Sequence, residues 1–256
     1  GHIVVWSSSG QAPDSNGYGV FAQRYDASGD KIGSEFLVNS TISNNQYEPS
    51  VAGLTGGSLD GGFVVVWQSF AQDGSGWGVY GRRYASDGTA IGGEFLVNAT
   101  TANDQAEPSV TALANGQFAV TWRSQLQDGN GQGVYFRVFN DDGTAATGEI
   151  LVTQTTAGDQ WTDGFIAETI TALDDGGFVV SWRSVAGGDW DVFARVFNAD
   201  GSARSNEFQV STGGGPDYYG TVGALAGAGA GFVVTWTDTS GADGSSYGVF
   251  ARRYDA

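Results

Sequence analysis

The chain has 256 residues, of which 42 are glycine, and it contains no cysteine and no methionine. Its net charge of -17 at pH 7 excludes the basic surface that a nucleic-acid-binding protein needs. The lack of cysteine excludes disulfides and thiol chemistry, and no apolar stretch reaches the roughly 18 residues of a membrane-spanning helix. We therefore expect no nucleic-acid partner and no insertion into a membrane.

A short apolar strand that ends in tryptophan recurs five times along the chain. The tryptophans are Trp6, Trp67, Trp122, Trp182 and Trp236. Their spacing of 54 to 61 residues is typical of the four-stranded blades of a β-propeller. Residues 63–67 are apolar on both faces of the predicted strand, which indicates burial on both sides, as in sheets stacked around an axis.

Each unit reads as four strands in chain order. The inner strand begins at Pro49 in the second unit, and the tryptophan strand follows it. The third strand carries an arginine between two aromatic rings, and the fourth opens with a glutamate after a hairpin turn rich in Asp and Gly. Because a buried arginine needs a partner, we expect cross-strand ion pairs. The predicted pairs are Arg82–Glu94, Arg137–Glu149 and Arg195–Glu207.

The sequence thus predicts an all-β protein, a five-bladed β-propeller with blades of about 55 residues in a single domain. The predicted repeat units are 1–48, 49–107, 108–165, 166–218 and 219–256. The first unit lacks an inner strand and the last lacks an outer strand, so both end blades are incomplete. Since unpaired strand edges invite association, we expect contacts between the chain ends or a homo-oligomer formed through the incomplete terminal blades.

The loop between the second and third strands repeats an aspartate followed by Gly, Ser or Asn. Such loops offer hard oxygen ligands to calcium, although each holds a single carboxylate. The candidate metal ligands are Asp14, Asn16, Asp73, Ser75, Asp128, Asn130, Asp243 and Ser245. The alternative is an ordinary Asx turn, in which the aspartate accepts hydrogen bonds from the backbone.

The same loop ends in a residue that is aromatic in four of the five units. Rings beside a glycine turn are platforms for a sugar face or for a protein partner. The candidate ligand-binding residues are Tyr18, Trp77, Gln132, Trp190 and Tyr247, together with Trp161 from an insertion in the third connection between units. The alternative is that these rings pack between neighbouring blades.

Enzyme motifs are largely missing from the sequence. The single histidine is His2, which removes a histidine-based triad and a histidine zinc site. Paired carboxylates would suffice for a glycosidase, but no acidic residue stands out from those that repeat. We therefore expect no catalytic residues.

The chain resembles a repeat of large secreted bacterial surface proteins, often found beside RTX (haemolysin-type calcium-binding) segments. The resemblance rests on residues 61–69, 73–80 and 93–98 and extends over nearly the whole chain. The resemblance implies an extracellular location, a surface context and calcium, although the RTX nonapeptide itself is absent.

From these features we predict a non-enzymatic binding or adhesion module that presents its loops to a glycan or a cell surface, supported by calcium. The alternatives are a structural or self-assembling spacer of a larger protein and, third, a glycan-active enzyme that uses carboxylates.

Overall fold

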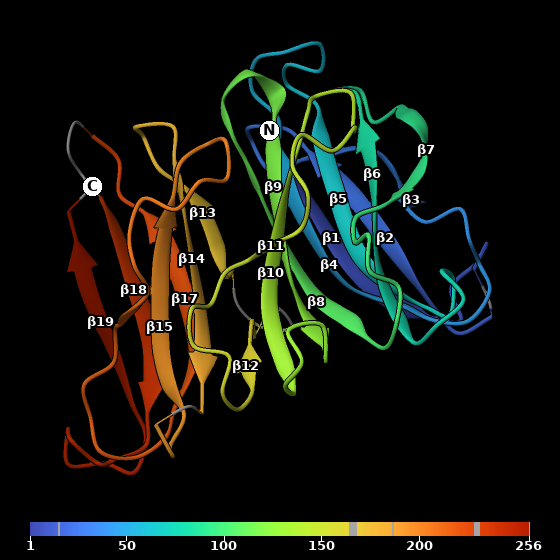
Figure 1. Ribbon diagram of the computed structural model, residues 1–256. Coiled ribbons are helices and arrows are strands. Elements are labelled where there is room, and N and C mark those ends of the chain that lie inside the picture. The colour runs from blue at the N-terminus through green and yellow to red at the C-terminus, as the bar shows by residue number, and fades with distance from the viewer. Residues whose placement is uncertain (15, 164–167, 186, 228–230, 256) are drawn as a thin grey trace.

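The computed structural model describes residues 1–14, 16–163, 168–185, 187–227 and 231–255, which fold into five antiparallel sheets (Figure 1). We number the sheets I to V in chain order. Sheet I contains β1 (His2–Ser9), β2 (Tyr18–Tyr25) and β3 (Lys31–Leu37). Sheet II contains β4 (Gln46–Gly53), β5 (Phe63–Phe70), β6 (Trp77–Tyr84) and β7 (Ala90–Leu96).

The remaining sheets repeat this order, and a short 3-10 turn (Ala114–Gly116) follows β8. Sheet III contains β8 (Gln105–Ala112), β9 (Phe118–Gln125), β10 (Gln132–Phe139) and β11 (Ile150–Leu151). Sheet IV contains β12 (Gln160–Trp161), β13 (Ile170–Ala172), β14 (Phe178–Ser184), β15 (Asp191–Phe197) and β16 (Phe208–Gln209). Sheet V contains β17 (Asp217–Ala224), β18 (Phe232–Asp238) and β19 (Gly248–Tyr254).

The predicted all-β architecture of five sheets around the tryptophan strands is confirmed. As expected, sheet I has three strands and no inner strand, and sheet V has three strands and no outer strand. The inner strand of sheet II begins at Gln46, earlier than the predicted Pro49. The predicted boundary between residues 165 and 166 lies outside the described residues. Across the described ranges, no helix has the length and apolar character needed to cross a membrane.

The sheets pack face to face, and the tryptophans of sheets II to V point toward the preceding sheet. Trp67 of sheet II shares a core with Val20, Ala22 and Val38 of sheet I. The same pattern brings Trp122 against sheet II, Trp182 against sheet III and Trp236 against sheet IV. The other face of each tryptophan strand packs on the following sheet, which explains why these strands are apolar on both sides.

The predicted arginine–glutamate ion pairs are wrong. Arg82 Nη1 donates to the carbonyl of Val38 at 3.0 Å, and Glu94 accepts hydrogen bonds from the backbone N–H groups of Ser40 and Thr41. The register between β6 and β7 shifts between Gly81 and Arg83, so Arg82 and Glu94 do not form a regular cross-strand pair. Both side chains reach back to the preceding sheet. The equivalent contacts are Arg137–Val97, Arg195–Val152, Glu149–Thr100 and Glu207–Thr155.

The inner strands share a local irregularity near their first residues. The register of β4, β8 and β17 shifts there, as in a β-bulge. One residue at each irregularity has a positive φ, a conformation that residues other than glycine rarely adopt. These residues are Glu48 (φ 53), Glu107 (φ 56) and Tyr219 (φ 58), and in sheet IV Asp163 (φ 52) takes the same conformation just after β12. Bulges of this kind redirect a side chain and are frequent near active sites.

Candidate active site

Three consecutive inner strands each place a carboxylate at this irregularity. Glu48 belongs to sheet II, Glu107 to sheet III and Asp163 to sheet IV, and the sheets adjoin in that order. For the two glutamates, the backbone N–H group is bonded to the preceding sheet. The N–H of Glu48 donates to Ser7 Oγ at 3.2 Å, and the N–H of Glu107 donates to Gln68 Oε1 at 2.9 Å. These bonds fix the direction in which the acids point.

Glu107 is a buried carboxylate with an arginine partner. Arg123 Nε lies 2.8 Å from Glu107 Oε1, and both side chains are mostly shielded from solvent. Arg123 also donates to Gln132 Oε1 at 3.1 Å. Thr162 Oγ1 donates to the carbonyl oxygen of Glu107 at 3.2 Å and thereby ties sheet IV to sheet III beside the acid. The ion pair thus holds the carboxylate of Glu107 against the guanidinium of Arg123 in the interior of the fold.

Asp163 has an equivalent arrangement one sheet further along. Arg183 Nε lies 2.8 Å from Asp163 Oδ1, and the N–H of Tyr219 donates to Asp163 Oδ2 at 3.2 Å. Burial raises the pKa of Asp163 to about 6, and the nearby charge of Glu107 adds to this, although Arg183 opposes it. Asp163 therefore changes charge close to neutral pH.

Glu48 has no cationic partner of its own. Burial raises the pKa of Glu48 to about 7, the charge of Glu107 raises it further, and Arg123 opposes the shift. The buried oxygen Oε2 of Glu48 has no hydrogen-bond partner. The charge of Glu107 thus acts on both Glu48 and Asp163, and of these two Glu48 has the higher pKa.

Trp161 lies between the two arginines. Its ring centroid is 4.8 Å from Cζ of Arg123 and 5.3 Å from Cζ of Arg183. Arg183 also lies over the rings of Trp190, at 4.6 Å, and Tyr218, at 5.5 Å. Cation–π contacts of this kind hold both guanidinium groups in place beside the carboxylates.

Four aromatic rings form a wall that begins at the residue next to Glu48. Tyr47 lies 4.6 Å from Tyr18 and 5.5 Å from Trp77, measured between ring centroids. Trp77 in turn lies 5.1 Å from Phe70. Tyr18 and Phe70 are exposed. We call these four residues the aromatic wall.

The structure brings five of the six predicted ligand-binding residues to the surroundings of the acids. Tyr18 and Trp77 belong to the aromatic wall, Gln132 contacts Arg123, and Trp161 and Trp190 contact the guanidinium of Arg183. The sixth, Tyr247, is 68% exposed and forms no ring contact with the residues that the structure describes. Tyr247 lies in the loop between β18 and β19 of sheet V, which is not one of the three sheets that carry the acids.

The sequence analysis missed Glu48, Glu107 and Asp163. A signal was present, because Glu48 and Glu107 both stand two residues after a glutamine and directly before a proline. In Asp163 the spacing from Gln160 is three residues, so the third acid departs from the pattern.

The predicted calcium loops form Asx turns. One carboxylate oxygen of each aspartate accepts the N–H two residues further on, at 3.3 Å for Asp14, 3.0 Å for Asp73 and Asp128, and 2.9 Å for Asp243. The donors are Asn16, Ser75, Asn130 and Ser245, which were predicted as ligands alongside the aspartates. Within the described part of the chain, no group of three or more His, Asp or Glu side chains could hold a metal ion. Calcium binding stays a prediction.

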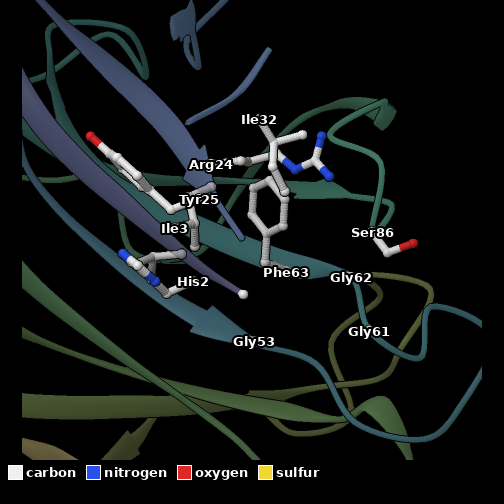
Figure 2. A pocket seen from close by; sticks show the side chains of 12 residues that line it. His2, Ile3, Arg24, Tyr25, Ile32, Gly53, Gly61, Gly62, Phe63 and Ser86 are labelled. Atoms are coloured by element: carbon white, nitrogen blue, oxygen red, sulfur yellow. The ribbon is translucent and has the colours of Figure 1, made fainter. Parts of the chain in front are cut away.

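Two cavities adjoin the inner strands. One of about 380 Å³ is lined by β4, β8, β13 and β17 and by Glu168, whose carboxylate accepts a hydrogen bond from Ser109 Oγ at 3.1 Å. Burial raises the pKa of Glu168. Another of about 540 Å³ lies between sheets I and II at the opposite end of the strands from Glu48, and Figure 2 shows His2, Arg24 and Phe63 around it. No acidic residue lines this second cavity, so it is not the candidate active site.

No protein-family model and no curated protein matches the sequence. Solved structures do resemble the fold. The chain superposes on the endo-arabinase of Bacteroides thetaiotaomicron VPI-5482 with a TM-score of 0.52 and 12% identity over 98% of this chain and 89% of that one. It also resembles the α-L-arabinofuranosidase of Lactobacillus brevis, with a TM-score of 0.49 and 10% identity over 98% and 86% of the two chains.

These comparisons overturn two predictions made from the sequence. We expected a non-enzymatic binding or adhesion module, or a structural spacer, with no catalytic residues. The fold is instead similar to that of an endo-arabinase, which is an enzyme. The physical reason for the error is that a repeated strand pattern is the same in binding, structural and enzymatic folds, so it does not distinguish among them.

Proposed function

We propose that the chain is a glycoside hydrolase whose sheets are arranged as the blades of a propeller-like fold, with the active site at Glu48, Glu107 and Asp163. The observation that carries this proposal is that three adjacent inner strands present a carboxylate at the same irregular backbone position. One of these acids lacks a cationic partner and two are paired with arginines. Glycosidases need such a set, with one acid protonated and another ionised.

The environments of the acids assign their roles. Glu48, whose pKa is raised to about 7, donates a proton to the leaving-group oxygen of the glycosidic bond. Glu107, which is paired with Arg123, is the carboxylate that acts on the opposite side, on water or on the sugar carbon itself. Asp163, fixed by Arg183 and the N–H of Tyr219, stabilises the positive charge that develops on the sugar ring.

The surroundings of the acids suit a carbohydrate. Sugar rings present apolar C–H faces, and the aromatic wall offers ring faces of matching size directly beside Glu48. Because the fold is similar to that of an endo-arabinase, arabinan and other arabinose-containing polysaccharides are the first substrates to test.

The test is the release of reducing sugar from a panel of polysaccharides that includes arabinan. We expect hydrolysis by the unaltered chain and a loss of about 10³-fold in kcat/KM for Glu48→Gln and for Glu107→Gln, since general acid–base groups contribute about 10² to 10⁴-fold. The matched control is Glu35→Gln, which changes an exposed glutamate on β3 in the same way. Thermal unfolding of each variant shows whether it is folded.

Hydrolysis that survives both substitutions, or a panel on which the folded chain releases no sugar, would overturn the proposal.

A further inference from the structure

Sheets I and V each leave one face uncovered. Val4 of β1 is 44% exposed and Val249 of β19 is 82% exposed. Val4 lies on the face of Trp6 that points away from sheet II, because Ile3 and Val5 are the residues of β1 that pack toward sheet II. Val249 lies on the face of sheet V that points away from sheet IV, because Trp236 and Phe250 pack toward sheet IV.

The valines equivalent to these two are buried in the other four sheets. The equivalent of Val4, two residues before the tryptophan, is Val65 in sheet II, and the equivalent of Val249 is Val20 in sheet I. Val65 and Val20 are both fully buried in the same core between sheets I and II. The other three interfaces repeat the pairing, with Val79 and Val120, Val134 and Val180, and Val192 and Val234.

The four interfaces therefore define a rule for what covers each exposed face. In sheets I to IV, the face equivalent to the Val249 face of sheet V is covered by the tryptophan strand of the following sheet. The face of sheet I that carries Val4 and Trp6 is a tryptophan face of this type, so the two uncovered faces are complementary. The exposure of Val4 and Val249 shows that these two faces do not meet within the chain.

Sheet I also departs from the other tryptophan faces in a way that suits sheet V. Four arginines donate to the carbonyl of the residue that follows the outer strand of the preceding sheet; they are Arg82, Arg137, Arg195 and Arg252. In sheet I the equivalent residue is Gln23, which turns back and donates to carbonyls of its own sheet, including that of Arg24 at 2.9 Å. The side chain of Gln23 therefore needs no acceptor from a sheet that docks on this face.

We propose that sheet V of one copy of this chain docks on sheet I of a second copy, head to tail, with Val249 against Val4 in the manner of Val20 against Val65. The contact joins two different faces, so it leaves each pair with one free sheet I and one free sheet V. Further copies then add, and the assembly ends as a ring if the rotation closes or as a chain if it does not. This inference does not depend on the proposed catalytic activity.

The experiment uses Val4→Asp and Val249→Asp, each of which places a charge on one of the two faces. Both positions are exposed in the single chain, so both variants should fold, as circular dichroism will show. We expect the unaltered chain to increase in mass with concentration in sedimentation velocity, and each variant alone to stay monomeric. The matched control is Leu126→Asp, which changes an apolar loop residue that is 53% exposed, and this variant should associate like the unaltered chain.

Mixing the two variants gives the decisive result. Val4→Asp keeps an intact sheet V, and Val249→Asp keeps an intact sheet I, so the mixture can form one productive contact. We expect a one-to-one heterodimer that grows no further. A chain that is monomeric at every concentration, with Val249→Asp lowering its melting temperature, would show instead that sheets I and V close on each other within one copy. Dimers that persist in either variant alone would show a symmetric contact. Either result overturns the proposal.

Discussion

The Asx-turn loops and the inner-strand irregularities are both repeated features of this chain, but their side chains behave in opposite ways. Asp14, Asp73, Asp128 and Asp243 occupy the same place in four units and make the same hydrogen bond in each. The irregularity also recurs in four units, with the same positive φ, yet it carries Glu48, Glu107, Asp163 and Tyr219.

The difference between these two regions teaches where chemistry is placed in a repeat protein. A residue that is identical in every unit satisfies a need that every unit has, such as closing a turn. The irregularity in the inner strand recurs with the same backbone conformation, but its side chain and the neighbours of that side chain differ from unit to unit. The same backbone geometry can therefore hold side chains with different functions. The four predictions below test that separation, together with the catalytic substitutions described above.

We expect the largest loss of stability from Glu149, a residue that repeats in several units, and we expect no separate effect on activity. Glu149→Ala removes the carboxylate that accepts the N–H of Thr100 and the hydroxyl of the same residue in the preceding sheet. Leaving these donors unpaired should cost about 2 to 3 kcal/mol of unfolding free energy. Urea unfolding measures the loss. A decrease in kcat/KM larger than the fraction of unfolded protein explains would show that this repeated residue also contributes to activity.

The pH profile tests the divergent positions. In the mechanism we propose, Glu48 acts in its protonated form and Asp163 in its ionised form, and their pKa values are raised to about 7 and about 6. We expect kcat/KM to be highest between these values and to fall on both sides, approaching tenfold per pH unit, with apparent values that belong to the coupled group. Glu35→Gln should leave the profile in place. A profile that is flat from pH 5 to about 8 would contradict the assignment.

Asp217 is a position where sheet V differs from the other sheets in a buried residue of the inner strand. It stands at the start of β17, where the other inner strands begin with Gln46, Gln105 and Gln160, and it is wholly buried opposite Asp238. Burial raises the pKa of Asp217 to about 6, and the charges of Asp238 and Asp191 add to this. The folded protein thus loses stability as the pH rises from about 4 toward 6 and does not regain it above.

Asp217→Asn removes this penalty. We expect the melting temperature at pH 8 to rise by roughly 3 to 6 °C, for about 1 to 2 kcal/mol, and the gain to shrink at pH 4. Differential scanning calorimetry at both pH values measures it. An equal shift at both pH values would mean that the charge of Asp217 is not responsible.

Calcium should have the smallest effect. Each predicted loop holds one aspartate, and one of its oxygens already accepts a backbone N–H. A loop that is half occupied adds only about 0.4 kcal/mol to stability. We expect a small rise in melting temperature between excess EDTA and millimolar calcium, and Asp73→Asn should reduce it. A large rise would show that these loops bind metal tightly as well as closing turns.

The repeat made most of the fold predictable. Tryptophans at blade-sized spacing placed the strands that become β1, β5, β9, β14 and β18, and the incomplete first and last units followed from the same pattern. The partners of Arg82 and Glu94 were not predictable, because a pattern of strands shows which residues share a sheet but not which sheet a long side chain reaches.

The site was harder to predict for a related reason. Rings such as Trp77 and Trp190 were identified because aromatic residues in turns are conspicuous, and the structure places them near the acids. The acids themselves were hidden, since their low solvent exposure and their distance from one another along the chain have no trace in the sequence. Only the stacking of sheets II, III and IV brings residues 48, 107 and 163 into one electrostatic group.

The contacts between sheets also carry a direction. Each internal tryptophan reaches toward the sheet that precedes it in the chain, as do the arginines and glutamates equivalent to Arg82 and Glu94. Arg24 and Arg83 make the smaller contribution in the other direction, since they donate to carbonyls of the following sheet. During synthesis the preceding sheet has already left the ribosome, so the docking surface for each internal tryptophan is present when its own sheet is made. The fold can therefore be laid down one sheet at a time in the order in which the message is read.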